Sequence, residues 1–312
     1  MGRSFFIKSS RMTRFKGIFE NRSTAVHAVV LIYFLLFGFL LSAICGAAIM
    51  SVSNAINGNI ADMPFYTQHG VQFVASLFLF ALPAFGTAYC CSRNPVAFLH
   101  AEKIANAKVL LLSAVMLLLI SPTIDFTAYF NSKMQLPDFM ASVENWMRER
   151  EDLTANMTER LLSEKGFFPF FTNILIIGVM AGVTEEFFFR GVILSLIREK
   201  IKNPHVAIWI VAILFSIIHF QFYGFIPRIL LGAFLGYLLY WCRTIWIPIF
   251  VHFLNNTIAV VGYKTGFSDV SDNSTLITDA ASREELLYMG VIAIAGLLLF
   301  GFCAKKIKRD LA

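Results

Sequence analysis

Two adjacent glutamates and an arginine interrupt an apolar stretch of this sequence. Glu185, Glu186 and Arg190 lie in the segment Gly182–Gly191, which reads GVTEEFFFRG. Ionisable side chains at bilayer depth cost a few kcal/mol each, so they usually face a cavity or a partner and serve a function. The alternative is structural, with both glutamates only holding neighbouring helices together.

Helical geometry separates the two glutamates. Glu186 and Arg190 are four residues apart and lie on nearly the same helix face, so they are predicted to form an ion pair. Such a pair neutralises two buried charges, which costs far less than burying either one alone. Glu185 is rotated by about 100° from Glu186 and is therefore free to point into a cavity, where a carboxylate can act as a general base or acid.

Two later apolar segments each carry a histidine. His219 ends the run FSIIH, and His252 begins the run HFLNN, which also contains Asn256. Glu185 lies about 16 residues before the turn at 200–202 and His219 about 17 after it, so both are predicted about 25 Å from that turn. A glutamate and a histidine can activate water, and a second histidine with an asparagine can stabilise an oxyanion.

The same residue types also suit a metal ion. Histidine and carboxylate ligands are typical of zinc, but a zinc site needs at least three ligands to converge from Glu185, Glu186, His219 and His252. The sequence has no H-E-x-x-H motif. From the residues alone, water activation and metal binding both stay open.

Composition indicates the environment of these residues. The 312-residue chain is 57% hydrophobic and only 15% charged, with a mean hydropathy of +0.69. A soluble domain carries about 25% charged residues, so the chain is predicted to be an all-α, polytopic membrane protein. The net charge of +6 does not indicate nucleic-acid binding, because the basic residues lie between apolar runs and not along one face.

Apolar runs of about 20 residues predict eight transmembrane helices. The predicted spans are 25–50, 71–92, 108–130, 168–194, 205–224, 226–242, 245–263 and 285–304. With both termini in the cytoplasm, 17 of the 26 basic residues fall in cytoplasmic segments and 8 in outer ones. This asymmetry favours a multi-pass protein of the cell (inner) membrane, with the lipid bilayer as its surroundings.

These spans divide the chain into five parts. They are a basic cytoplasmic N-terminus (1–24), three spans (25–130), a connection (131–166), a core with the polar residues (167–263), and a loop with the last span (264–312). The connection alternates apolar and charged residues at helical spacing, which predicts an amphipathic helix on the membrane surface or capping the bundle. Residues 264–284 are polar and are predicted to be a mobile loop.

Three motifs together resemble the CAAX-protease and bacteriocin-processing family (CPBP, also called Abi), which includes the type II CAAX prenyl endopeptidases. The family shows E-E-x-x-x-R, F-x-x-x-H and H-x-x-x-N or D on successive membrane helices. This chain matches them in order with Glu185 to Arg190, with Phe215 to His219, and with His252 to Asn256. The resemblance covers residues 167–263.

The resemblance implies an intramembrane endopeptidase and a role for each motif residue. Glu185 and His219 would activate the attacking water, and His252 and Asn256 would stabilise the oxyanion. Glu186 and Arg190 would support the site. No cofactor is favoured; a zinc-dependent version would use Glu185, His219 and His252 as ligands. The substrate would be a peptide or a membrane-protein segment, such as a CAAX-like tail or a leader peptide.

Two other functions fit the same residues. Polar groups at mid-membrane also suit an ion-coupled transporter, although the sequence shows no internal repeat and no paired broken helices. A member of the family without proteolytic activity would act as a membrane scaffold or immunity protein. Replacement of Glu185 separates these possibilities, because only a protease would lose peptide cleavage.

Overall fold

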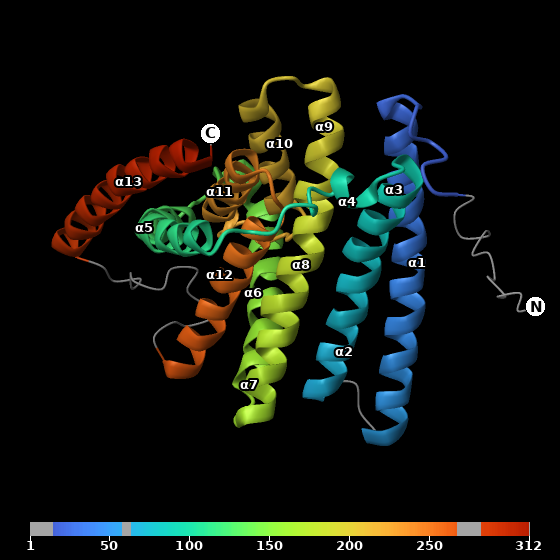
Figure 1. Ribbon diagram of the computed structural model, residues 1–312. Helices are drawn as coiled ribbons and strands as arrows, with labels where there is room; N and C mark the ends of the chain where they lie inside the picture. The colour runs from blue at the N-terminus through green and yellow to red at the C-terminus, as the bar shows by residue number, and fades with distance from the viewer. Residues whose placement is uncertain (1–14, 58–63, 267–281, 312) are drawn as a thin grey trace, which may run out of the picture.

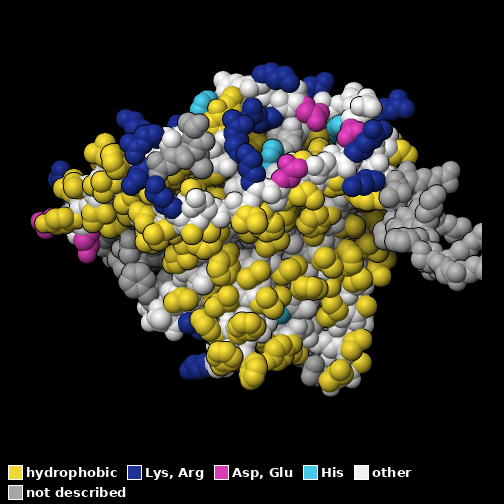
Figure 2. Space-filling model, viewed as in Figure 1, with side chains coloured by type: hydrophobic (Ala, Val, Ile, Leu, Met, Phe, Trp, Pro, Cys, Tyr) yellow, Lys and Arg dark blue, Asp and Glu magenta, His cyan; other side chains and the backbone are white. Residues whose placement is uncertain are grey.

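The computed structural model describes residues 15–57, 64–266 and 282–311, and every regular element in these ranges is a helix (Figure 1). Seven of the described helices are long and apolar enough to cross a membrane. Figure 2 shows the surface this creates, with hydrophobic side chains forming a broad band and Lys and Arg gathered at one end of the molecule. The all-α, polytopic membrane fold predicted from the sequence is confirmed.

The first spans are two helices that lie side by side. The helix α1 covers Thr24–Asn57, and the second span runs through α2 (Phe65–Ser76), the π-helical turn η2 (Leu77–Ala81) and α3 (Leu82–Cys91). At Gly38 of α1, an added Cβ would collide with the backbone carbonyl of Phe78. The absent side chain lets the two helices approach at backbone distance, as small residues do in membrane helix pairs.

The central span carries the two glutamates. It runs continuously over Phe167–Lys200 through α7 (Phe167–Asn173), η4 (Ile174–Met180), α8 (Ala181–Glu186), η5 (Phe187–Ile193) and α9 (Leu194–Lys200). The elements η4 and η5 are π-helical, and they flank the short α8 on both sides. Such π-helical insertions are frequent at functional sites, because they re-aim side chains without ending the helix.

The four remaining spans are α5 (Ala107–Ser132), α11 (Phe225–Cys242), α12 (Trp246–Thr265) and α13 (Arg283–Leu311), and the helix α10 (Pro204–Ile217) is too short to count among the seven. Of these helices, α10 and α12 pack directly on the central span. The helices α10 and α11 pack as an antiparallel pair, and α13 packs on α5, inclined to the rest of the bundle at its edge (Figure 1). The side chains of Asn106 and Asn203 accept hydrogen bonds from backbone N–H groups in the first turns of α5 and α10, and so cap these helices.

The fifth predicted span is shorter than expected. The prediction extended it to residue 224, whereas α10 ends at Ile217 after 14 residues. Two backbone carbonyls near this point accept side-chain hydrogen bonds: His219 donates from Nδ1 to the carbonyl of Phe215 in the last turn of α10 at 2.7 Å, and Ser216 donates from Oγ to the carbonyl of Phe225 at the start of α11 at 2.8 Å. The last carbonyls of a helix need partners, and the bond from His219 supplies one, so the helix can end inside the apolar run.

The predicted amphipathic segment is present. After a short helix, Asp138–Met140, the helix α6 covers Ala141–Ser163 and packs against α2, α7 and α12. At its start, Arg148 donates to Glu144 at 2.7 Å, and Glu144 also accepts the backbone N–H of Leu136 at 2.8 Å. The predicted N-terminal segment and the predicted loop at 264–284 fall largely on residues 1–14 and 267–281, which lie outside the described residues.

Candidate active site

Glu186, Arg190 and His252 form a buried charged cluster. Arg190 donates from Nη1 to Oε1 of Glu186 at 2.6 Å, and Nδ1 of His252 donates to the same oxygen at 2.8 Å. Glu186 and Arg190 have no exposed surface, and His252 is 3% exposed. The predicted ion pair is therefore confirmed, and His252 is a third member that the spacing of the sequence did not indicate.

Close helix packing positions this cluster. Arg190 also donates from Nη2 to the carbonyl of Gly232 in α11 at 2.8 Å, and its guanidinium lies 4.8 Å from the ring centre of Phe215. On the other side, Gly182 lets α8 approach α12, since an added Cβ would meet the backbone nitrogen of Phe253 at 3.1 Å. The cluster thus joins four helical segments, which fixes its geometry.

Glu185 has different surroundings from its neighbour. Its side chain keeps some accessible surface, and no described residue forms a hydrogen bond or ion pair with it. It lies within electrostatic range of His252, Glu186, Arg190 and Arg228. Neither oxygen of this carboxylate has a described hydrogen-bond partner, and charged side chains lie nearby. The carboxylate is therefore available to bind and deprotonate a water molecule.

His219 lies in the turn after α10 and not on a helix. Its imidazole donates from Nδ1 to the carbonyl of Phe215, so in the neutral tautomer its Nε2 carries a lone pair. No described residue bonds to Nε2, and the side chain is partly exposed. The next residue, Phe220, has a left-handed backbone with φ of 52°. Such strained backbone clusters at functional sites in proteins.

Asn256 lies one helical turn after His252 on α12. Its side-chain nitrogen donates to the carbonyl of Ile177 in η4 at 2.9 Å, and its oxygen is 3.4 Å from the side-chain nitrogen of Asn255. The bond to Ile177 ties α12 to the π-helical segment η4. One hydrogen of the Asn256 amide remains available for a ligand.

The structure adds Arg228, which sequence reasoning counted only among the outer basic residues. It lies in the first turn of α11, and Gln221 holds its guanidinium through its side-chain oxygen at 2.6 Å and its backbone carbonyl at 3.3 Å. Arg228 is within electrostatic range of both Glu185 and His219. An arginine at the start of an apolar helix is itself a signal of function, and it could have been noticed in the sequence.

The structure brings the motif residues into one region, but hydrogen bonds do not join every pair that was predicted to act together. His252 is within electrostatic range of both Glu185 and His219, but no hydrogen bond joins Glu185 to His219 or His252 to Asn256 in the described part of the chain. Across the described residues, no three His, Cys, Asp or Glu side chains gather so that they could hold a metal ion. Glu185, His219 and His252 as arranged here do not fit a three-ligand zinc site.

Comparisons with known proteins point to one family. Residues 167–258 match the family model described as Type II CAAX prenyl endopeptidase Rce1-like. The match covers less than a third of the chain, from α7 into α12, and it includes all three motifs. Comparison with curated proteins and with solved structures gave no match. Through residues 167–258, this multi-pass membrane protein is related to the CAAX-protease (CPBP) family of membrane endopeptidases.

Proposed function

We propose that this chain is an intramembrane endopeptidase in which Glu185 and His219 activate water. The observation that carries the proposal is the contrast between fixed and available groups in one region. Glu186, Arg190 and His252 are held by one another, whereas Glu185 and Nε2 of His219 have no partner among the described residues. A water molecule between the two available groups would find a base in Glu185 and a hydrogen-bond acceptor in His219.

The reaction then follows the chemistry of these side chains. Glu185 takes a proton from water, and the hydroxide attacks the carbonyl carbon of the scissile peptide bond. The carbonyl oxygen becomes an oxyanion, which His252 and Asn256 stabilise by donating hydrogen bonds. The C–N bond breaks as Glu185 returns the proton to the leaving amine, so the carboxylate ends the cycle unprotonated.

The role of His252 places a condition on its protonation. Its Nδ1 donates to Glu186, so Nε2 can donate to an oxyanion only when both ring nitrogens carry protons. Glu186 and Arg190 act as positioning residues, because the carboxylate that Arg190 holds also accepts the hydrogen bond that orients His252.

The surroundings favour a substrate that lies in or on the membrane. A cavity of about 410 Å³ adjoins the His219 turn, and its lining is mostly apolar, including Met147 of α6, Phe220 and Phe222. An apolar side chain or a lipid-modified residue of a peptide would fit such a space. We therefore propose a membrane-associated peptide as substrate, either a CAAX-like tail or a leader peptide, and a cell (inner) membrane location with both termini in the cytoplasm.

The test is cleavage of a quenched-fluorescent peptide library by the purified full chain in detergent. Wild type is compared with Glu185→Gln and His219→Ala, each with and without a zinc chelator. Glu149→Gln is the matched control, because Glu149 is exposed on α6 and loses the same charge. We expect both site variants to lose cleavage by about 10²–10⁴-fold, the range for general acid–base groups, while the control keeps it.

Each outcome bears on a different part of the proposal. Activity that survives the chelator supports the metal-free mechanism that we favour, whereas activity lost to the chelator and restored by zinc would make the same residues ligands. Cleavage that persists in Glu185→Gln would overturn the catalytic assignment. If no sample cleaves any peptide, an ion-flux assay in liposomes tests the transporter function, and folded but inactive wild type without flux favours the scaffold.

A further inference from the structure

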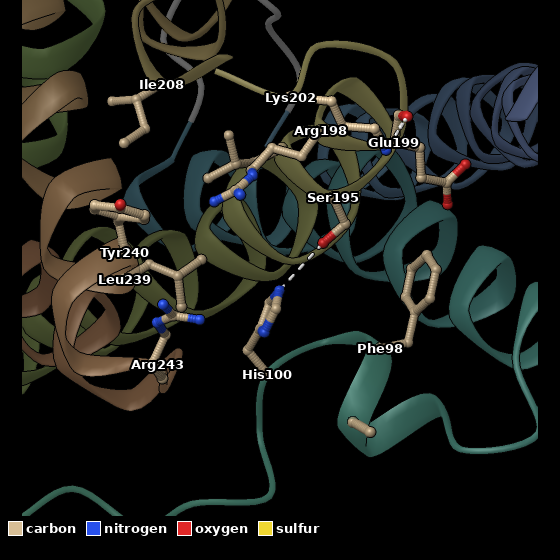
Figure 3. Close-up of a pocket in the computed structure, with 12 residues that line it drawn as sticks. Phe98, His100, Ser195, Arg198, Glu199, Lys202, Ile208, Leu239, Tyr240 and Arg243 are labelled. Carbon is tan, nitrogen blue, oxygen red and sulfur yellow. Dashed lines mark hydrogen bonds between the residues drawn. The ribbon is translucent and has the colours of Figure 1, made fainter. Parts of the chain in front are cut away.

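A second pocket lies away from the candidate active site and is lined by basic side chains. It has a volume of about 520 Å³ and is formed where α9, α10 and α11 meet the segment between α4 (Pro95–Phe98) and α5 (Figure 3). Its polar lining consists of His100, Ser195, Arg198, Glu199, Lys202, Tyr240 and Arg243, and we call this cavity the basic pocket. Leu194, Ile208 and Leu239 give it an apolar floor.

Tertiary hydrogen bonds hold the segment that closes the basic pocket. The backbone nitrogen of Ile245 donates to the carbonyl of His100 at 2.9 Å, and Thr244 donates from Oγ1 to the carbonyl of Lys103 at 2.6 Å. The indole of Trp246 donates to the carbonyl of Ala101 at 3.2 Å. The segment after α4 is therefore fastened to the start of α12, and the pocket is a built feature of the fold.

Two residues of the basic pocket have unusual backbone conformations. His100 has a φ of 57° and Arg243 a φ of 56°, and neither is glycine. Left-handed backbone at such residues costs of order 1–3 kcal/mol and persists only where the surrounding structure enforces it. Both strained positions direct charged or polar side chains into the same pocket, where His100 Nε2 is hydrogen-bonded to Oγ of Ser195 at 3.2 Å (Figure 3).

The arginines of the basic pocket have no carboxylate partner among the described residues. Arg198 and Arg243 both lie over the ring of Tyr240, each 5.7 Å from its centre. The nearby Glu199 is turned away from both, and its carboxylate lies 3.5 Å from Nδ1 of His27 (Figure 3). The two guanidinium groups thus face one space, with an aromatic ring between them and no ion pair to a described carboxylate.

The position of the pocket separates it from the active site and places it near the membrane surface. Ser195 lies ten residues beyond Glu185 on the same helix, about 15 Å along its axis. The pocket is at the end of the molecule where Lys and Arg gather, next to the apolar band (Figure 2). In other proteins, basic pockets between membrane helices on the cytoplasmic side bind the head groups of anionic lipids.

We infer that the basic pocket binds a phosphate-bearing anion through Arg198 and Arg243. Guanidinium groups present forked N–H donors that match phosphate oxygens, and the hydroxyl of Ser195 and the ammonium of Lys202 add further donors. The volume of the pocket is within the range of small-molecule sites, about 300–1,000 Å³. The anion is either the head group of an anionic phospholipid or a soluble phosphate, since both present the same oxygens.

Thermal unfolding of the purified full chain in an uncharged detergent tests this inference. Three probes are titrated separately: dioleoylphosphatidylglycerol, dioleoylphosphatidylcholine as its zwitterionic counterpart, and inorganic phosphate. A ligand that binds the folded state raises the unfolding midpoint and saturates, which gives an apparent affinity. Wild type is compared with the double variant Arg198→Gln/Arg243→Gln and with Lys16→Gln/Arg22→Gln, which removes two exposed positive charges outside the pocket.

We expect one anionic probe to saturate in wild type, with an affinity about tenfold weaker or worse in the pocket variant and unchanged in the control. Saturation by phosphatidylglycerol alone identifies a lipid head group, and saturation by phosphate with the same arginine dependence identifies a soluble source. No saturable response to either probe, or equal responses in all three proteins, overturns the inference. If the double variant does not fold, Arg198→Gln alone decides, because Arg198 is partly exposed and forms no hydrogen bond with described residues.

Discussion

Arg190 and Arg198 lie on the same continuous helix, about two turns apart, and have opposite surroundings. Arg190 has no exposed surface, and its charge is met by Glu186 and by the carbonyl of Gly232. Arg198 lies beside Tyr240 in an open pocket, where Arg243 is a second cation and no described carboxylate pairs with either. The helix therefore carries one arginine with an internal ion-pair partner and one with no carboxylate partner among the described residues.

The difference shows two uses of the same residue type. A buried ion pair is costly to form but far more costly to break, so Arg190 can hold Glu186 and His252 in one geometry without a ligand. A cluster of cations without internal anions raises the local potential and favours an anion from outside. The first arrangement prepares a site in advance, and the second becomes complete only on binding.

The largest expected effect is on stability at the buried end. Arg190→Leu leaves the Glu186 carboxylate without its arginine, and we expect the free energy of unfolding to fall by about 3–5 kcal/mol. Chemical unfolding of the purified protein in detergent measures this. The double variant Arg190→Leu/Glu186→Leu removes both charges and should be more stable than the single variant; a loss below about 1 kcal/mol in the single variant would contradict internal compensation.

The two adjacent glutamates provide a sharper version of the comparison. Glu186→Gln removes the charge that meets Arg190 and His252, and we expect it to lower the free energy of unfolding by about 3 kcal/mol. Glu185→Gln removes a carboxylate with no described partner, so the change should stay below about 1 kcal/mol. The same unfolding assay compares them, and equal losses would show that Glu185 also supports the fold.

At the open end, loss of charge should leave stability almost unchanged. Arg198→Gln/Arg243→Gln removes two cations that no described carboxylate meets, so without added anion we expect a change within about 0.5 kcal/mol. Unfolding in lipid-free micelles tests this, and a loss comparable to that of Arg190→Leu would mean that the pocket arginines have a structural role.

The smallest expected effect is a pH dependence at the basic pocket. Burial, and then the positive charges of Arg198 and Arg243, hold the pKa of His100 below its usual 6.5. The ring is therefore neutral at pH 7, and it gains a proton only when the pH falls through the lowered pKa. Because protonation adds a cation beside Ser195, Lys202 and the two arginines, binding of phosphatidylglycerol should tighten by about twofold to fivefold at lower pH.

His100→Gln is the matched control for that prediction. Phosphatidylglycerol is a phosphodiester, so its own charge does not change over this pH range, and the carboxylate of Glu199, which also lines the pocket, is turned away from the two arginines (Figure 3). Titrations of wild type and His100→Gln with this lipid, at several pH values, separate the contribution of the imidazole. An identical pH dependence in both proteins would assign the effect to another group.

Some parts of this structure followed directly from local features of the sequence. The spacing of Glu186 and Arg190 predicted their ion pair, because residues four apart share a helix face. Hydrophobic length predicted the helical membrane fold, and the alternation in 131–166 predicted α6. The prediction for 205–224 was wrong at its end, because the His219 side chain satisfies the carbonyl of Phe215, an interaction that hydropathy does not register.

Contacts between distant segments could not be predicted in the same way. The hydrogen bond between His252 and Glu186 joins residues 66 positions apart. The position of Arg228 relative to Glu185 and His219 depends on how α11 begins after the turn. The basic pocket collects residues from 97 to 243 that share no local pattern. The charge of each basic residue is visible in the sequence, but whether a carboxylate or an open space lies opposite depends on helix packing.

The sequence by itself determined the class of the molecule and the candidate chemical groups, since both depend on side-chain type, hydrophobic length and helical period. The tertiary structure alone decided which groups are held and which are available. Glu186 is fixed because α12 brings His252 to it, and Glu185 remains open because none of the described helices supplies it with a donor. Close packing of helices makes that division, and the one-dimensional order of residues does not contain it.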